Sequence, residues 1–160
     1  MMRPTTLATT GAAVVATGVL GGLASRPAQS AWFAKLRKPS FQPPREVFPI
    51  VWPLLYADIA VVSAGAIDEF NEQGRRDEAR TYSALLALNL ILNASWSWLF
   101  FDRWRIGTSA VAAAALTASS ADLTRRAVGV RGAPAGALGL YPLWCAFATL
   151  LSTRIWWLNR

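Results

Sequence analysis

The fold of this chain is decided by residues 32–56, WFAKLRKPSFQPPREVFPIVWPLLY, where a basic, proline-rich segment leads into an apolar helix. Four prolines precede Trp52 in this stretch: Pro39, Pro43, Pro44 and Pro49. Proline fixes φ, donates no backbone hydrogen bond and keeps the preceding residue out of the α region, so the segment is predicted to be an ordered, extended cap. Trp32 and Phe41 give this cap apolar weight. We therefore expect it to fold back onto the rest of the chain.

The composition of the chain indicates a membrane protein. Of its 160 residues, 54% are hydrophobic and 16% are charged, whereas about a quarter of an ordinary soluble domain is charged. Eight tryptophans suit a membrane interface or a flat apolar ligand. The net charge of +7 comes from basic residues placed between apolar runs, as in the flanks of membrane spans, so we expect no nucleic-acid partner.

Several kinds of chemistry are excluded by the residues that the chain lacks. Cys145 is the single cysteine and there is no histidine, which excludes an intrachain disulfide, a multi-cysteine metal site, zinc-hydrolase chemistry and a Ser-His triad. The sequence also shows no paired carboxylates at a useful spacing and no glycine loop for phosphate. We expect no catalytic residues, no metal site and no required cofactor.

Five apolar segments are predicted to cross the bilayer as helices in a single domain covering residues 1–160. They lie at about residues 6–24, 48–67, 82–101, 106–123 and 135–158, and each is long enough to span the hydrocarbon core. The charged stretch 68–80 is predicted to be a solvated connection. Basic residues divide almost evenly between the two sides, so the positive-inside rule leaves the orientation open.

The first segment allows two interpretations. Gly18 and Gly22 form a GxxxG spacing, which permits close approach of a neighbouring helix. However, Arg3, the apolar run and the small residues Ala28 and Ser30 also match a signal peptide cleaved after Ser30.

Polar side chains are rare within the other segments. Asp58 is a functional candidate because acids inside a span face a bundle interior or water, although a structural hydrogen bond is the alternative. Asn89 and Asn93 share one helix face, with Trp96 one turn beyond. Their amides must find partners in an apolar helix, so they either bond a neighbouring helix or point into a ligand cavity.

Aromatic residues predict a cavity for a hydrophobic ligand. Trp52 and Tyr56 are four residues apart, so both can project into the same space as Trp144. In the last segment, Ala148 leaves a slot beside Trp144. The proline-rich loop would form a lid over this cavity, since pockets of this kind are apolar with few polar groups. The alternative is that these aromatics form only the core and the interface belts.

Several motifs resemble those of the TspO/MBR family (tryptophan-rich sensory protein, translocator protein or peripheral-type benzodiazepine receptor). The longest is K-P-x-x-x-P-P-x-x-V-F-P-x-x-W-x-x-L-Y at residues 38–56, preceded by Trp32. Farther on come A-L-N at residues 87–89, N-x-x-W-x-x-x-F-F at 93–101 and W-x-A-F-A-T at 144–149. Together they cover most of the chain, and they favour retention of the first span.

The resemblance implies an all-α membrane protein, a bundle of five transmembrane helices with a proline-rich lid loop between helices one and two, usually a homodimer. It also implies binding of porphyrins such as protoporphyrin IX and haem, and of isoquinoline and benzodiazepine ligands. The family's pocket residues carry over onto Trp52, Asn93, Trp144 and Ala148, with Tyr56, Asn89 and Trp96 as neighbours; Lys38 and the prolines belong to the lid.

The family's sterol motif is not intact here. It needs a tyrosine followed closely by a basic residue in the last helix, where this chain has Thr153 and Trp157, so sterol binding of that kind is not expected. Without histidine, haem iron would be unligated or held by tyrosine or Cys145. Stacking on tryptophan should then dominate, and metal-free porphyrin should bind about as well as haem.

The expected function is therefore a multi-pass membrane receptor or carrier for porphyrins in the lipid bilayer, with a sensory, regulatory or transport role in tetrapyrrole and stress physiology. The Ala- and Arg-rich composition suggests a bacterial cell membrane. Two alternatives are light-dependent degradation of bound porphyrin and secondary transport with Asp58 as the coupling site.

Overall fold

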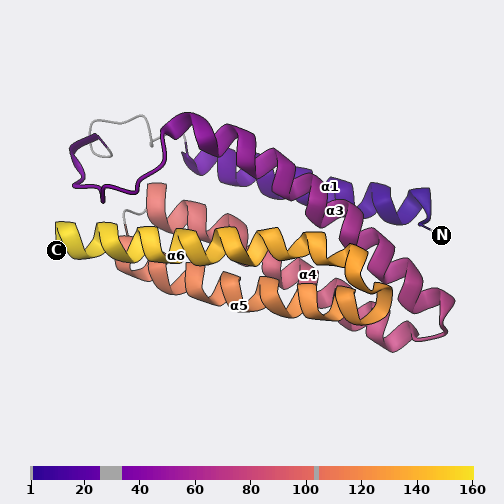
Figure 1. Ribbon diagram of the computed structural model, residues 1–160. Helices are drawn as coiled ribbons and strands as arrows, with labels where there is room; N and C mark the ends of the chain where they lie inside the picture. The colour runs from indigo at the N-terminus through magenta and orange to yellow at the C-terminus, as the bar shows by residue number, and fades with distance from the viewer. Residues whose placement is uncertain (1, 26–33, 103–104) are drawn as a thin grey trace.

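The computed structural model describes residues 2–25, 34–102 and 105–160, and this part of the chain is helical without strands. Its long helices are α1 (Pro4–Ser25), α3 (Phe48–Glu72), α4 (Arg76–Ser97), α5 (Ile106–Arg131) and α6 (Leu140–Asn159). Shorter turns are η2 (Arg45–Val47), the π-helical η3 (Trp98–Asp102) and η4 (Ala133–Gly139). The long helices run roughly parallel to one axis, and the two chain ends lie at opposite ends of the bundle (Figure 1).

Four stretches are long and apolar enough to cross a membrane: Pro4–Leu23, Phe48–Glu72, Arg76–Phe100 and Ala133–Asn159. The helix α5 is not among them. It is built from small and hydroxyl residues, and its second half carries Asp122, Arg125 and Arg126. The described residues therefore form an all-α membrane protein with several apolar helices, and the crossing of the bilayer by α5 stays a prediction.

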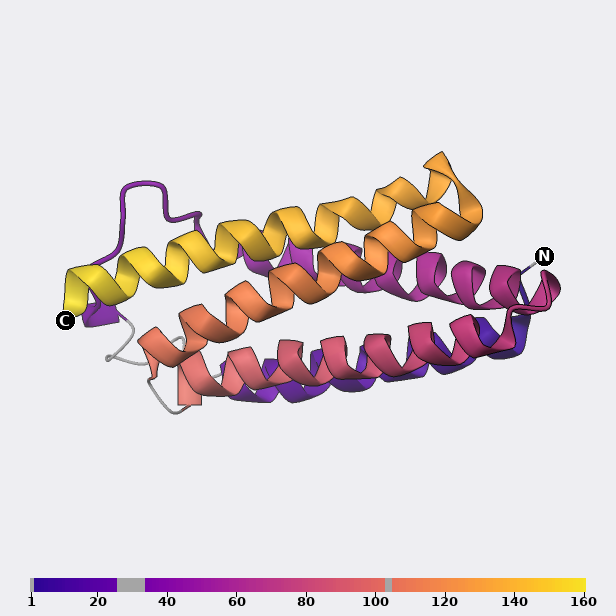
Figure 2. The same cartoon turned by 90° about the horizontal axis from the view of Figure 1, so that it is seen from below.

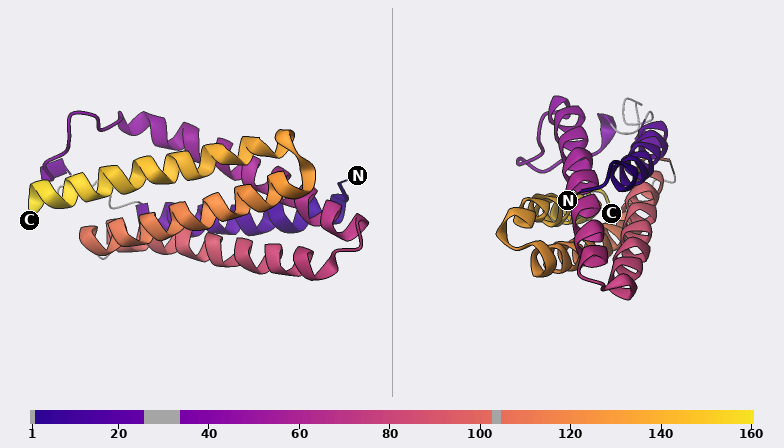
Figure 3. Two further views of the ribbon diagram at one scale, coloured as in Figure 1. Left: turned by 60° about the horizontal axis from the view of Figure 1, so that its bottom comes forward. Right: turned by 90° about the vertical axis from the view of Figure 1, so that its right-hand side faces the viewer.

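The helices α3 and α4 lie between α1 and the hairpin of α5 and α6, and they contact both. The hairpin of α5 and α6 lies on one side (Figure 2) and α1 lies on the other (Figure 3). Within the described ranges, α1 contacts α3, α4 and η3 but neither α5 nor α6. One consequence is that α1 forms a side wall whose inner face is not filled by the α5–α6 hairpin.

The helix α3 extends to Glu72, five residues beyond the predicted end of the second span. The predicted solvated stretch begins at Asp68, whose side chain is instead 2% exposed. Its carboxylate accepts hydrogen bonds from the backbone N–H of Arg3 at 2.5 Å and from the Thr6 hydroxyl at 2.7 Å. The first N–H groups of a helix have no partner inside it, so an acid of α3 serves as the cap of α1.

The helix α5 also continues past its predicted end at residue 123. The Asp122 carboxylate pairs with Arg125 at 2.7 Å and with Arg126 at 2.8 Å, one turn farther along the helix, and such pairs stabilise a helix. Gly132 ends α5 with φ of 79°, a conformation that glycine adopts without steric penalty.

The helix α1 packs against α3 through a hydrogen bond and a close approach. The Thr10 hydroxyl donates a buried hydrogen bond to the Ala60 carbonyl of α3 at 3.0 Å. Gly18 faces the Tyr56 ring, so that a Cβ atom at this position would lie 3.1 Å from Tyr56 Cε2. The close helix approach predicted for the GxxxG spacing therefore occurs at Gly18.

Candidate ligand-binding cavity

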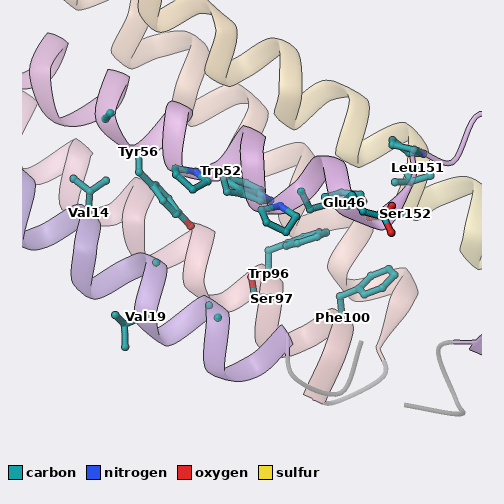
Figure 4. Close-up of a pocket in the computed structure, with 18 of the residues that line it drawn as sticks. Val14, Val19, Glu46, Trp52, Tyr56, Trp96, Ser97, Phe100, Leu151 and Ser152 are labelled. Atoms are coloured by element: carbon teal, nitrogen blue, oxygen red, sulfur yellow. The ribbon is translucent and has the colours of Figure 1, made fainter. Parts of the chain in front are cut away.

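A cavity of about 1450 Å³ lies between α1, α3, the end of α4 and α6. Figure 4 shows its lining, with Trp52 and Tyr56 projecting from α3, and Trp96 and Phe100 from the α4 end. The walls are mostly apolar, with a few polar groups such as Ser97 and Ser152. This combination is typical of sites for hydrophobic ligands.

The α3 wall follows from residue spacing. Phe48, Trp52, Tyr56 and Ala60 recur every four residues and all line the cavity, because residues four apart share a helix face. Pro49 sits in the first turn, where its missing N–H has no consequence. The Trp52 and Tyr56 rings are 5.5 Å apart and inclined by 30°, so they form one continuous aromatic surface.

The α1 wall is built from small residues and valines. Its lining residues recur at every turn of the helix, so that they share one face: Gly11, Val14, Val15, Gly18, Val19, Gly21 and Gly22. Val15 and Val19 are also 66% and 57% exposed, and α1 contacts neither α5 nor α6. This wall is therefore one helix thick, and in a membrane its other face meets lipid. The glycine spacing of α1 is visible in the sequence, but it does not mark this helix as part of the site.

One end of the cavity is covered by the proline-rich segment. Lys38, Gln42 and Pro43 line it, and Pro39 is buried whereas Pro44 is exposed just before η2. Trp32, the first residue of the predicted lid, lies outside the described residues.

The segment is held against the C-terminal end of α6. The backbone N–H of Arg37 donates to Asn159 Oδ1 at 2.9 Å, and Asn159 Nδ2 donates back to the Arg37 carbonyl at 2.8 Å. The Phe41 ring packs edge-on against Phe147, with centroids 6.2 Å apart. The cap thus folds back onto the bundle, as its prolines and aromatics predict.

Of the predicted ligand-contacting residues, Trp52, Tyr56 and Trp96 line the cavity. Trp144 does not; it packs edge-on against Trp52 at 6.3 Å and supports that ring. Ala148 is half-buried and also outside the lining. The helix α6 reaches the cavity one turn later, through Leu151, Ser152 and Ile155.

The two asparagines are buried and bonded to neighbouring helices. Asn93 accepts from the Tyr56 hydroxyl at 3.2 Å and donates to the Tyr141 oxygen at 2.9 Å. Asn89 accepts from the Tyr141 hydroxyl at 2.8 Å and donates to Ser119 and Ser120 of α5. Of the two possibilities left open by the sequence, the structure shows the bonds between helices. Among the residues that the structure describes, Tyr56 is the one that joins this network to the cavity lining.

The described residues offer binding rather than metal chemistry. No group of three histidine, cysteine or acidic side chains among them could hold a metal ion. Asp58 does not line the cavity, and its buried Oδ2 has no hydrogen-bond partner within the described ranges. The arrangement can hold a large, flat, apolar molecule between aromatic and aliphatic walls.

Comparisons with known proteins agree over nearly the whole chain. Residues 10–158 match the model of the TspO/MBR family. The chain is 34% identical over 145 residues to the Translocator protein of Bos taurus, covering 89% of this chain and 83% of that protein. It is 29% identical over 133 residues to the Tryptophan-rich protein TspO of Bacillus cereus, covering 83% and 84%. The Tryptophan-rich sensory protein of Cereibacter sphaeroides is 33% identical over 78 residues, 49% of this chain and 45% of that protein.

Proposed function

This chain belongs to the TspO/MBR family of membrane proteins, and we propose that it is a receptor or carrier that binds porphyrins and similar flat hydrophobic molecules in its cavity. Protoporphyrin IX and haem are the proposed ligands, with a sensory, regulatory or transport role in tetrapyrrole and stress physiology. The proposal includes α5 as a fifth membrane span, the segment before α3 as a lid, and a homodimer in a bacterial cell membrane.

The observation that carries the proposal is the size and lining of the cavity. Its volume of about 1450 Å³ exceeds the roughly 300–1,000 Å³ of pockets for drug-sized ligands, so it has room for a large macrocycle. Trp52 and Tyr56 offer one aromatic surface, and Trp96 stacks with Phe100 at 5.6 Å on the α4 side. A planar ligand between these surfaces would bury both of its faces.

The test is a titration of the detergent-purified protein with protoporphyrin IX in the dark, followed by tryptophan fluorescence. The proposal predicts saturable quenching, because the ligand would lie beside Trp52 and Trp96. Absence of quenching in protein that circular dichroism shows to be helical would contradict it. The same sample under light separates binding from degradation: a catalyst would bleach bound porphyrin faster than free porphyrin and yield a new absorbing product.

A further inference from the structure

A buried chain of hydrogen bonds leads from the cavity wall through the bundle to α5. It runs from Tyr56 on α3 to Asn93 on α4, then to Tyr141 on α6, back to Asn89 on α4, and ends at Ser120 on α5. All of its members except Tyr56 are buried. Each link is a donor–acceptor pair, so the position of every hydrogen can be derived from the partners.

The direction of the chain is fixed at its α5 end. The Ser120 oxygen lies 2.6 Å from the Leu116 carbonyl oxygen. A carbonyl cannot donate, so the single hydroxyl hydrogen of Ser120 must point there. Toward Asn89, at 3.1 Å, Ser120 can therefore only accept. The amide nitrogen of Asn89 faces Ser120, and its Oδ1 faces Tyr141.

The same reasoning identifies the donor in each remaining hydrogen bond as far as the cavity. Tyr141 gives its only hydrogen to Asn89 Oδ1 at 2.8 Å, so it must accept from Asn93 Nδ2 at 2.9 Å. With its nitrogen used in this way, Asn93 presents Oδ1 to Tyr56. Tyr56 therefore gives its own hydrogen to Asn93, at 3.2 Å.

The Tyr56 oxygen is left with accepting capacity only. No donor among the described residues bonds to it, and Figure 4 shows the hydroxyl end pointing toward the α4 side of the cavity, where Trp96 and Ser97 lie. Turning the hydroxyl hydrogen toward an acceptor of the ligand would break the bond to Asn93 and leave the Oδ1 of this buried residue without its donor. An oriented polar group in an apolar site of this kind discriminates strongly between donors and acceptors.

We propose that the Tyr56 oxygen accepts a hydrogen bond from the bound ligand, and that the cavity selects molecules carrying an N–H or O–H donor between apolar rings. This inference rests on the proposed function. A donor held in the apolar cavity away from Tyr56 would be left without this acceptor. A ligand acceptor placed at Tyr56 would instead meet another acceptor.

The test uses three tricyclic molecules of nearly the same shape. Carbazole carries an N–H group, fluorene a methylene and dibenzofuran an ether oxygen at the same position. Dissociation constants are measured by tryptophan quenching and corrected for partition of each compound into detergent. Wild-type protein should bind carbazole roughly three- to tenfold more tightly than fluorene, the range of one net hydrogen bond, and should show no preference for dibenzofuran over fluorene.

Two variants assign the preference to one oxygen. Tyr56→Phe keeps the ring and should bring the carbazole-to-fluorene ratio close to one. Tyr82→Phe is the matched control, because Tyr82 is also a tyrosine whose hydroxyl bonds a neighbouring side chain, Ser63 at 3.0 Å, but lies outside the cavity lining. It should keep the wild-type ratio. If Tyr56→Phe does not fold, the order of the three ligands on wild-type protein decides alone.

The outcomes separate this inference from the proposed function. Equal binding of carbazole and fluorene, a preference for dibenzofuran, or a carbazole preference that survives in Tyr56→Phe would overturn the role of the Tyr56 oxygen while leaving the cavity as a binding site. Binding of protoporphyrin IX without any binding of carbazole would also overturn this inference alone. Absence of binding by every tricycle and by protoporphyrin IX would overturn both.

Discussion

Trp52 is the residue on which the cavity is centred. It lies in the middle of the α3 row that lines the site, with Tyr56 on one side and Phe48 on the other. Trp144 supports its far edge, and Phe48 packs against Trp144 at 5.8 Å. The indole is thus held in place by other rings before any ligand arrives, and a fixed aromatic surface loses little entropy on binding.

Replacing Trp52 by alanine should weaken the binding of protoporphyrin IX by about tenfold or more, since stacking on one aromatic ring is worth about 1–3 kcal/mol. The dark titration measures this change. Trp157→Ala is the matched control: that ring is 52% exposed near the end of α6 and does not line the cavity. Equal losses in the two variants would show that the quenching reports adsorption to the surface.

At the same scale, sequence spacing predicts which side chains share a face but not what they meet. Trp52 and Tyr56 were predicted on one cavity wall from a spacing of four. Asn89 and Asn93 were placed on one face by the same rule, yet their partners Ser120 and Tyr141 come from helices about 30 and 50 residues farther along the chain. No local pattern specifies such partners, so the choice between a helix contact and a ligand contact required the structure.

Among the elements, α1 depends on a group outside itself. Its sequence has no acidic residue in the first turn, and the cap is the Asp68 carboxylate on α3. An acid at a helix N-terminus is favoured by the exposed N–H groups and the helix dipole. The sequence does not predict this role, because an acid in the charged stretch 68–80 looks the same whether its carboxylate is solvated or bonded to a distant backbone group.

Asp68→Ala should destabilise the protein by about 1–3 kcal/mol, because it leaves the Arg3 N–H and the Thr6 hydroxyl without their acceptor. Thermal unfolding in detergent should show a lower midpoint, and hydrogen exchange should rise first in the opening turns of α1. Glu69→Ala serves as the control, since among the described residues the Glu69 carboxylate bonds only the exposed Gln73 of the turn that ends its own helix. Midpoints that fall together would contradict the capping role.

The side chain of Asn159 on α6 bonds the backbone of the segment before α3. Asn159→Ala removes both hydrogen bonds to the Arg37 backbone. If this segment is a lid, the variant should release porphyrin roughly five- to tenfold faster, as expected for two exposed hydrogen bonds of modest net strength. Stopped-flow displacement measures the rate.

Thr153→Ala is the matched control for this release experiment, because the Thr153 hydroxyl bonds only within α6. Unchanged release from Asn159→Ala would mean that the segment covers the cavity without controlling access to it.

For the whole molecule, the absence of histidine shapes the expected ligand preference. The chain contains no histidine, and Cys145 is buried outside the cavity lining. The Tyr56 hydroxyl keeps its hydrogen in the bond that it donates to Asn93. Haem iron would therefore find no histidine, cysteine or methionine ligand among the described lining residues. The all-helical membrane class follows from composition and apolar runs alone, and the motifs are sufficient to identify the family. The position of α1 along the cavity cannot be predicted from the sequence, because small residues pack in the same way against a neighbouring helix as against a ligand.

We expect haem to bind no more tightly than protoporphyrin IX. Parallel dark titrations compare the two, and the absorption spectrum of bound haem should lack the features of a strongly ligated iron. Zinc protoporphyrin gives a further comparison with a closed-shell metal. Markedly tighter binding of haem, with a ligated spectrum, would show that the iron finds a protein ligand.

The α1 wall, one helix thick, affects the solvent against which the affinity of a ligand is measured. Because Val15 and Val19 line the cavity from a helix that contacts neither α5 nor α6, a ligand that passes this wall within the membrane would exchange with hydrocarbon rather than with water. The natural concentration scale is then the mole fraction of ligand in the bilayer. A compound that partitions strongly into lipid gains little from the hydrophobic effect on entering the cavity, so shape, stacking and hydrogen bonding would decide which membrane solutes are retained.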